Sequence, residues 1–141
     1  MRVLHLTTEF PPIIYGGLGT AVGGLVAASS QAGIETAVLL VGAGGDPSYQ
    51  RPTSTDSEPR NEPAIQSIAG IHVHPVSHAD AVRYALRLIL AWRPDVLHLH
   101  VFWLWPLARA LRARTGLNIL YTVHSLDRAE YELGQGPPDR R

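Results

Sequence analysis

The chain has 141 residues, a length that favours a single domain built around one hydrophobic core. Its 12 basic residues, all of them arginine, balance 12 acidic residues, and this neutral charge argues against a nucleic acid as a partner. The sequence has no cysteine and no lysine, which excludes disulfides, thiolate metal sites, a cysteine nucleophile, Schiff-base chemistry and a lysine-type phosphate loop.

The first element is a short strand over residues 2–8, which the pair Pro11 and Pro12 ends near Glu9. Apolar residues at helical spacing then predict a helix from about Leu18, with Gly33 as its C-terminal stop. A strand that leads through glycines into a helix places backbone N–H groups and the positive end of the helix dipole beside solvent. This loop therefore predicts a site for an anion such as phosphate.

A second strand is predicted over residues 36–42, where a continuous apolar run suits a strand covered on both faces. Residues 43–64 are polar and rich in glycine and proline, which indicates a mobile surface loop. Residues 70–76 alternate apolar side chains with histidine and predict a third strand. Pro75 cannot donate a ladder hydrogen bond, so we expect this strand at an edge of the sheet.

A second helix follows a capping-box pattern at Ser77 and Asp80, buries an apolar stripe and ends at Pro94. The stripe consists of Val82, Ala85, Leu86 and Ile89. The remaining elements are a strand over 95–101, a helix over 103–114 with arginines on its polar side, a strand over 118–124, a short helix over 126–133 and a flexible tail over 134–141.

Strands that alternate with helices in this way predict a doubly wound, Rossmann-like α/β fold. We expect about five parallel strands in the order 3-2-1-4-5, within three αβα layers. Ligands of such sheets bind outside the carboxyl ends of the strands, where the strand order reverses. The glycine loop, His100 and His124 should therefore converge on one rim, although they are far apart in the sequence.

The glycine loop does not fit the dinucleotide fingerprint. Val22 stands where that fingerprint needs a small residue, and no acidic residue ends the second predicted strand. An NAD site is therefore not expected. Besides a phosphate site, the sequence also allows a tight strand-to-helix connection that binds no ligand.

Three segments at successive strand ends resemble the N-terminal half of a GT-B glycosyltransferase of the family 4 and glycogen synthase type. The segments are residues 9–19 (EFPPIIYGGLG), 94–100 (PDVLHLH) and 121–125 (YTVHS). They occur in the order that the family shows, and the likeness extends over most of the chain.

This resemblance implies that residues 1–133 form the Rossmann-like, acceptor-side domain of a retaining glycosyltransferase that uses a nucleotide sugar as co-substrate and needs no metal or other cofactor. It implies a donor-phosphate loop at Gly16, Gly17, Leu18 and Gly19. It implies that His124 is the catalytic residue, reaching the transferred sugar or the leaving phosphate. The acceptor side would comprise Glu9, Tyr15, His100 and Trp103. Val101 and Tyr15 depart from the family pattern, so the acceptor is not identified.

Members of this family carry a second domain that holds the donor, and we expect this C-terminal donor domain to be absent from the chain. The expected partner is such a domain or a separate chain that carries it, and the chain alone should be inactive. Missing strands would leave apolar surface open, which favours self-association. The alternative is a non-catalytic module of the same fold that binds a glycan, phosphate or partner chain.

Several residues also have ordinary structural interpretations. His5, His98 and His100 on neighbouring strands could hold a metal, but no carboxylate lies at ligand spacing, so histidines of the core or rim are favoured. Glu9 could be a catalytic carboxylate or could bond its own loop, and His72 and His74 should be surface or half-buried residues.

The aromatic segment 102–107, followed by arginines, could touch a membrane surface, but packing of its aromatic side chains on the sheet is favoured. The N-terminus lacks the pattern of a signal peptide, and no apolar run is long enough to span a membrane. These features predict a cytoplasmic protein.

Overall fold

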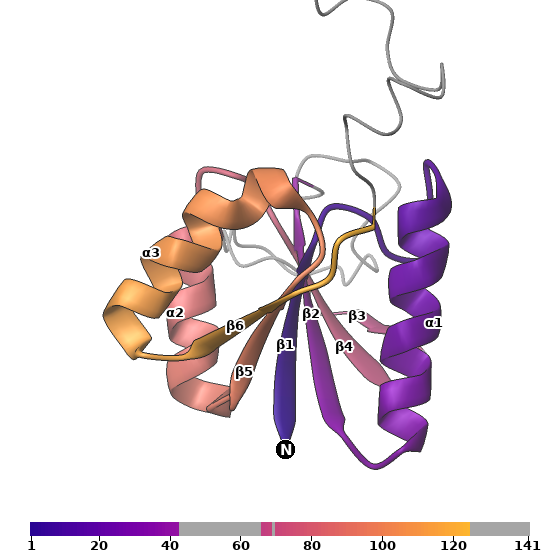
Figure 1. Ribbon diagram of the computed structural model, residues 1–141, viewed down its shortest axis with the longest axis horizontal. Helices are drawn as coiled ribbons and strands as arrows, with labels where there is room; N and C mark the ends of the chain where they lie inside the picture. The colour runs from indigo at the N-terminus through magenta and orange to yellow at the C-terminus, as the bar shows by residue number, and fades with distance from the viewer. Residues whose placement is uncertain (43–65, 69, 125–141) are drawn as a thin grey trace, which may run out of the picture.

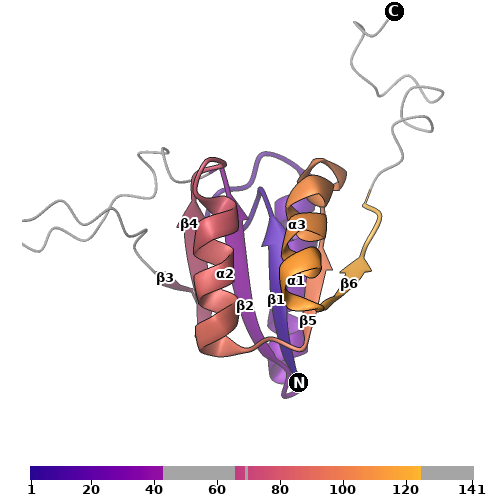
Figure 2. The ribbon, with the colours of Figure 1, turned by 90° about the vertical axis from the view of Figure 1, so that its left-hand side faces the viewer.

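The computed structural model describes residues 1–42, 66–68 and 70–124 of the chain. A six-stranded sheet lies between two layers of helices, with α1 on one face and α2 and α3 on the other (Figures 1 and 2). The strands are β1 (Arg2–Thr7), β2 (Glu35–Val41), β3 (Gln66–Ile68), β4 (Ile71–Val76), β5 (Val96–Leu99) and β6 (Asn118–Tyr121). The helices are α1 (Gly17–Gln31), α2 (Ala81–Trp92), the short 3-10 helix η3 (Phe102–Leu104) and α3 (Trp105–Thr115).

The strand order is β3-β4-β2-β1-β5-β6, and all neighbours are parallel except β3 and β4. The five parallel strands confirm the predicted order 3-2-1-4-5 and the three-layer Rossmann-like fold. The prediction that residues 70–76 form an edge strand is wrong, because β3 pairs with β4 on its outer side. That pairing covers only Ile71 to Val73, so Pro75 lies beyond it and costs no hydrogen bond to β3.

The two faces of the sheet are packed separately, as the alternation of side chains along a strand requires. Leu4 and Leu6 of β1 belong to the apolar cluster under α2 and α3, whereas Val38 and Leu40 of β2 pack with α1. Residues 36–41 of β2 are all buried, which confirms that this strand is covered on both faces.

Helix α1 packs on the sheet through Val22 and Val26, both fully buried, and the chain leaves it through Gly33 at a φ of 82°. That left-handed conformation suits glycine, as the sequence predicted. Gly23 lies against the preceding loop, because a Cβ at this position would come within 2.9 Å of Pro11. The loop and the first turns of α1 are therefore packed as one unit.

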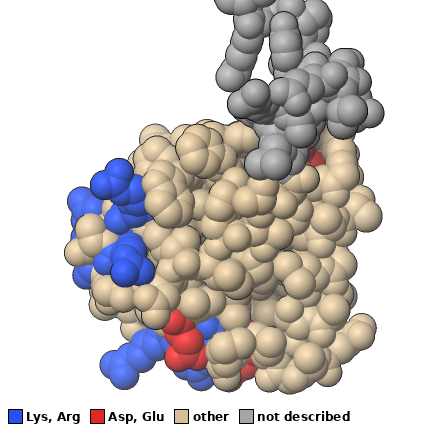
Figure 3. All heavy atoms as spheres, viewed as in Figure 1, with Lys and Arg blue, Asp and Glu red and all other residues tan. Residues whose placement is uncertain are grey.

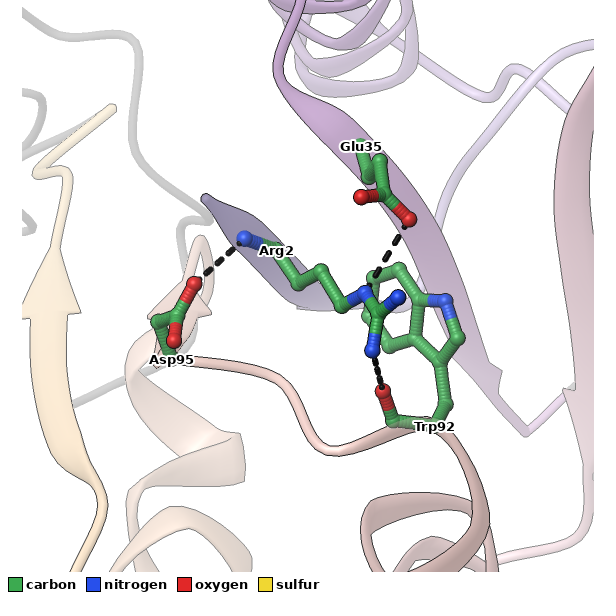
Figure 4. Close-up of polar contacts among 4 residues, drawn as sticks. All are labelled: Arg2, Glu35, Trp92 and Asp95. Carbon is green, nitrogen blue, oxygen red and sulfur yellow. Dashed lines mark hydrogen bonds and ion pairs between the residues drawn. The ribbon is translucent and has the colours of Figure 1, made fainter.

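Arg2, at the start of β1, joins three segments at the amino end of the sheet through the contacts that Figure 4 shows. Its backbone N–H donates to Asp95 Oδ2 (2.7 Å), and its guanidinium donates to Glu35 Oε2 (3.0 Å) and to the carbonyl of Trp92 (2.9 Å). These contacts tie the start of β1 to the start of β2 and to the α2–β5 connection.

Two helices differ in detail from their predictions. Ser77 and Asp80 are hydrogen-bonded to each other, with the Asp80 N–H donating to Ser77 Oγ (3.2 Å) and Ser77 Oγ donating to Asp80 Oδ2 (2.9 Å). They do not form the predicted capping box of α2, which begins at Ala81 after Asp80 and has no side-chain cap hydrogen bond. The segment predicted as one helix over 103–114 is divided into η3 and α3. No helix in the described ranges is long and apolar enough to cross a membrane.

The aromatic residues before α3 do not pack on the sheet, so that prediction is wrong. Phe102 is 67% exposed and Trp103 is 64% exposed, whereas the buried side consists of Leu104, Leu107, Ala108 and Leu111. The proline and the 3-10 turn place the aliphatic residues inward instead.

Figure 3 shows the basic side chains gathered on the α3 side of the molecule, where Arg109, Arg112 and Arg114 are exposed. The predicted loop 43–64 and the predicted elements 126–133 and 134–141 lie outside the described residues.

Candidate functional site

The loop that follows β1 is held by local hydrogen bonds. Thr7 Oγ1 donates to the carbonyl of Glu9 (3.0 Å) and accepts from the Glu9 N–H (3.3 Å). Phe10 and Ile13 form an isolated antiparallel bridge around the cis peptide bond between Pro11 and Pro12, and both side chains are buried. The loop therefore fixes the Glu9 backbone at the carboxyl end of β1.

The Glu9 carboxylate organises the start of α1. Its Oε2 accepts hydrogen bonds from the backbone N–H groups of Tyr15 (3.1 Å), Gly16 (3.2 Å) and Gly19 (3.3 Å). A helix N-terminus has unpaired N–H groups and a positive dipole end, and a carboxylate stabilises both. Of the two interpretations of Glu9, the structure shows the bonding to its own loop, which occupies part of the predicted anion site.

The glycines of this loop have two different surroundings. A Cβ at Gly19 would lie 3.1 Å from Ile14 and 3.3 Å from Glu9, so a side chain here would crowd the loop that precedes α1. A Cβ at Gly16 or Gly17 would have no atom within 4 Å. The open face of the predicted phosphate loop is therefore at Gly16 and Gly17. Leu18, which lies between Gly17 and Gly19, is half-buried.

Histidines from three neighbouring strands meet on the side of the sheet opposite Leu4 and Leu6. His5 of β1 is paired in register with His98 of β5. His100 follows β5 and is 1% exposed, whereas His124, three residues beyond β6, is exposed. The predicted convergence of His100 and His124 at one rim is thus seen in the structure.

Hydrogen bonds connect these histidines. His5 Nδ1 lies 2.9 Å from His100 Nε2, and His100 Nδ1 lies 3.1 Å from His124 Nε2. His98 stacks on His100, with ring centroids 4.2 Å apart, and its Nε2 lies 2.7 Å from Thr122 Oγ1. We call His5, His100 and His124 the histidine line, which runs from the core to the surface.

Burial keeps the inner histidines neutral. Desolvation, followed by the charge of His98, lowers the pKa of His5 to about 3. Desolvation, followed by the charges of His98, His5 and His124, lowers the pKa of His100 to about 2. Both imidazoles are therefore uncharged near pH 7, and each carries one N–H.

The cluster also has the composition of a metal site. One ring nitrogen from each of His5, His98 and His100 lies within 4.8 Å of the others. Zinc bound by histidine has Zn–N distances of about 2.0–2.1 Å and needs three lone pairs aimed at one point. In the structure the nearly parallel rings of His5 and His100, 12° apart, instead direct two nitrogens at one another. A bound metal ion would have to replace that hydrogen bond.

The outer part of the rim is aromatic. Tyr15 is 77% exposed beside the glycine loop, and Trp103 is exposed in η3, directly after the strand that carries His98. His100 is buried and hydrogen-bonded to His5 and to His124, and of these two partners His124 is the exposed one.

The sequence indicates His5 only as a candidate metal ligand and gives Thr122 no role. A contact between His5 and His100 could have been predicted, because their side chains point to the same face of two strands that were predicted to be neighbours. The bond between Thr122 and His98 had no signal in the sequence, since it depends on the path of the chain after β6. His74, expected at the surface or half-buried, is buried beside Tyr84, with Nδ1 2.8 Å from the Tyr84 hydroxyl oxygen.

Comparison with known proteins identifies the family of the chain. The model of the glycosyl transferase 4-like domain matches residues 16–141. Two glycogen synthases of Mycobacterium tuberculosis, from strains CDC 1551 and H37Rv, are each 30% identical over 144 aligned residues. Each alignment covers 90% of this chain and 34% of the relative, in its N-terminal region, so the chain spans about a third of the length of these relatives. The chain belongs to the glycosyl transferase 4-like domain family.

Proposed function

We propose that this domain is the N-terminal, acceptor-side half of a retaining glycosyltransferase that transfers a sugar from a nucleotide-sugar donor. The observation that supports this most is the hydrogen bond between His100 and His124 at the carboxyl ends of β5 and β6, the same end of the sheet at which the Glu9 loop follows β1. The strand order reverses at β1 and β5, which is where ligands bind to doubly wound sheets.

The donor diphosphate is proposed to approach the open face of Gly16 and Gly17. The absence of side chains there allows the backbone N–H groups and the α1 dipole to stabilise the negative charge that the leaving phosphate gains. Glu9 already binds three N–H groups of the same loop. Its carboxylate therefore fixes the loop but also repels a phosphate placed directly beside it, which favours contact at Gly17 and Leu18.

His124 is proposed as the residue that contacts the transferred sugar or the leaving phosphate, because it is the exposed end of the histidine line. Tyr15 and Trp103 offer exposed aromatic faces for the acceptor. His100 and Glu9 are proposed to contribute to the acceptor side indirectly. His100 holds His124 by a hydrogen bond, and Glu9 holds the glycine loop.

The chain spans about a third of the length of its relatives. We expect the 141-residue chain alone to transfer no sugar from UDP-glucose, ADP-glucose or GDP-mannose, because one wall of the cleft would have to come from a donor-binding domain. A radiometric transfer assay with glycogen, maltooligosaccharides and simple phosphates as acceptors measures this. Turnover by the chain alone would contradict the two-domain interpretation.

The binding experiment uses the 15N-labelled chain and the same three nucleotide sugars at millimolar concentration. The amide signals of Gly16, Gly17 and His124 are expected to shift, because a ligand at the rim changes their surroundings. Replacing His124 with alanine should weaken binding, whereas replacing the exposed His72, on β4, should not. Shifts confined to other parts of the chain would contradict this assignment.

A non-catalytic binding module of the same fold is the second candidate. It is favoured by the Glu9 carboxylate, which occupies N–H groups that a phosphate would otherwise use. This candidate predicts that glycans shift the signals of Tyr15 and Trp103 while nucleotide sugars and free nucleotides leave the loop unchanged. The same titration therefore separates the two functions.

A further inference from the structure

The histidine line connects a fully buried side chain to the exposed rim. His5 and His100 are each 1% exposed, and His124 at the outer end is exposed. The two links are 2.9 Å (His5 Nδ1 to His100 Nε2) and 3.1 Å (His100 Nδ1 to His124 Nε2). Both distances are typical of hydrogen bonds, so each link needs one N–H donor and one lone pair.

The positions of the hydrogens along this line are coupled, because a neutral imidazole has only one N–H. If His5 Nδ1 donates to His100 Nε2, then the hydrogen of His100 is on Nδ1. His100 Nδ1 then donates to His124 Nε2, and His124 must carry its own hydrogen on Nδ1. The opposite direction reverses all three tautomers together.

The buried end decides between the two directions. His5 Nε2 is buried and has no hydrogen-bond partner among the described residues. If His5 donates to His100, this nitrogen carries only a lone pair. If His100 donates to His5, the nitrogen carries a buried N–H that has no acceptor among the described residues. Buried N–H groups without partners are the rarer case in proteins, because the donor loses water and gains nothing. The outer end is exposed, so water can satisfy His124 in either direction.

We propose that His100, itself held by His5, is a positioning residue that fixes His124 as the tautomer with hydrogen on Nδ1. His124 Nε2 is then bound to His100, and His124 Nδ1–H is available as a donor to an oxygen of the ligand at the rim. This assignment rests on the proposed function for the identity of that ligand, a sugar or phosphate oxygen. The tautomer itself is a property of the chain without ligand.

Fixing the tautomer has a chemical consequence. A sugar hydroxyl or a phosphate oxygen can accept a hydrogen bond from His124 Nδ1–H at neutral pH without any change of protonation. A histidine free to exchange its tautomers would present this donor only part of the time. The buried pair thus prepares His124 for an oxygen-rich ligand before binding, which reduces the cost of ordering the site.

The test is a long-range 1H–15N correlation spectrum of the imidazole rings of the full 141-residue chain at pH 7. Protonated and unprotonated ring nitrogens differ widely in 15N chemical shift, so the spectrum reports each tautomer directly. We expect His5, His100 and His124 all to carry hydrogen on Nδ1. A His124 that carries hydrogen on Nε2, or that averages both forms, would overturn the proposal.

Two variants separate positioning from folding. In His100→Phe, His124 loses its partner and should show the tautomer mixture of free histidine, in which Nε2–H predominates. In His72→Phe, which replaces an exposed histidine of β4 outside the line, His124 should keep its single tautomer. An unchanged His124 in folded His100→Phe contradicts the proposal. If that variant does not fold, the spectrum of the unaltered chain still decides.

Metal analysis of the purified chain completes the test. A stoichiometric zinc ion, with the nitrogens of His5 and His100 shifted as ligands, would overturn the hydrogen-bonded line, because both cannot use the same lone pairs. Failure of the proposed function would instead appear as missing nucleotide-sugar binding with an unchanged His124 tautomer. The two failures are therefore distinguishable.

Discussion

Burial has removed the basicity of the inner histidines, and this affects stability as well as chemistry. The pKa values of His5, about 3, and His100, about 2, lie far below the ordinary value of 6.5, with desolvation as the main cause of both shifts. In the unfolded chain the same side chains are in water and take up protons near pH 6.5. The unfolded state therefore binds more protons than the folded state in mildly acidic solution.

We predict that the chain loses stability as the pH falls below about 6.5. Above that pH both states carry neutral histidines, so this contribution is fully present. Between 6.5 and the low folded pKa values, each buried histidine should lower the free energy of unfolding by about 1.4 kcal/mol per pH unit. Urea unfolding at pH 7.5, 6.5 and 5.5 measures the slope.

His5→Phe is the matched variant for this prediction, since phenylalanine keeps an aromatic ring but cannot titrate. Its slope below pH 6.5 should be smaller than that of the unaltered chain by about the share of one histidine. An equal slope in the two proteins would show that His5 does not contribute to the pH dependence.

Glu9 is the second residue whose role can be measured alone. Its carboxylate accepts from the N–H groups of Tyr15, Gly16 and Gly19, so Glu9→Ala should lower the free energy of unfolding by about 1–2 kcal/mol. Glu9→Gln keeps an acceptor oxygen and should lose less. Chemical denaturation measures both, and an alanine variant as stable as the parent would contradict the role of Glu9 in holding the loop.

At the scale of elements, helix and strand ends depend on single backbone positions. Helix α3 ends at Gly116 with a φ of 75°, which glycine adopts without strain. Helix α2 ends at Arg93 with a φ of 53° and ψ of 63°, a left-handed conformation that costs a residue with a Cβ about 1–2 kcal/mol. Arg93 is exposed, so its side chain is not needed for packing.

Arg93→Gly should therefore raise the free energy of unfolding by about 0.5–1 kcal/mol. Glycine relieves the backbone strain, but its greater freedom in the unfolded chain offsets part of that gain. Arg93→Ala keeps the Cβ and serves as the control, with no gain expected. Thermal and urea unfolding measure both variants. A glycine variant no more stable than the alanine variant would mean that the α2 terminus is not strained.

The elements that sequence predicted correctly are those with a strong period. The helical spacing of Val22 and Val26 and the unbroken apolar run of β2 identified these elements, and the regular alternation of strands and helices then gave the strand order, because a doubly wound sheet has few alternative topologies. Strand β3 was not predicted, since three residues carry no usable period. The edge position of β4 was wrong because proline excludes pairing only at its own position.

The site could be predicted in part. Alternation placed His98 and His100 on one side of a strand, and the strand order brought His124 to the same rim. The bonds of the histidine line could not be predicted, because they depend on the register of His5 with His98 and on ring rotations. Glu9 remained open because a carboxylate at a strand end suits both catalysis and capping.

At the scale of the whole molecule, the loop that carries Glu9, the pair His100 and His124, and η3 with Trp103 all follow strands at the carboxyl end of the described sheet. The chain belongs to the glycosyl transferase 4-like domain family and aligns with about a third of each glycogen synthase relative. In the proposed function a donor-binding domain forms the other wall of the transfer site, so the contribution of this domain is best measured when that wall is supplied.

The most direct measurement is sugar transfer by a chimera in which residues 1–124 replace the matching N-terminal segment of the Mycobacterium tuberculosis glycogen synthase. The chimera is expected to transfer sugar from a nucleotide-sugar donor, and His124→Ala should reduce its rate by at least about 100-fold, as expected for loss of a group that stabilises transition-state charge. The matched variant His72→Ala should leave the rate unchanged. An active chimera whose rate does not depend on His124 would contradict the proposal that this rim is one wall of a sugar-transfer site.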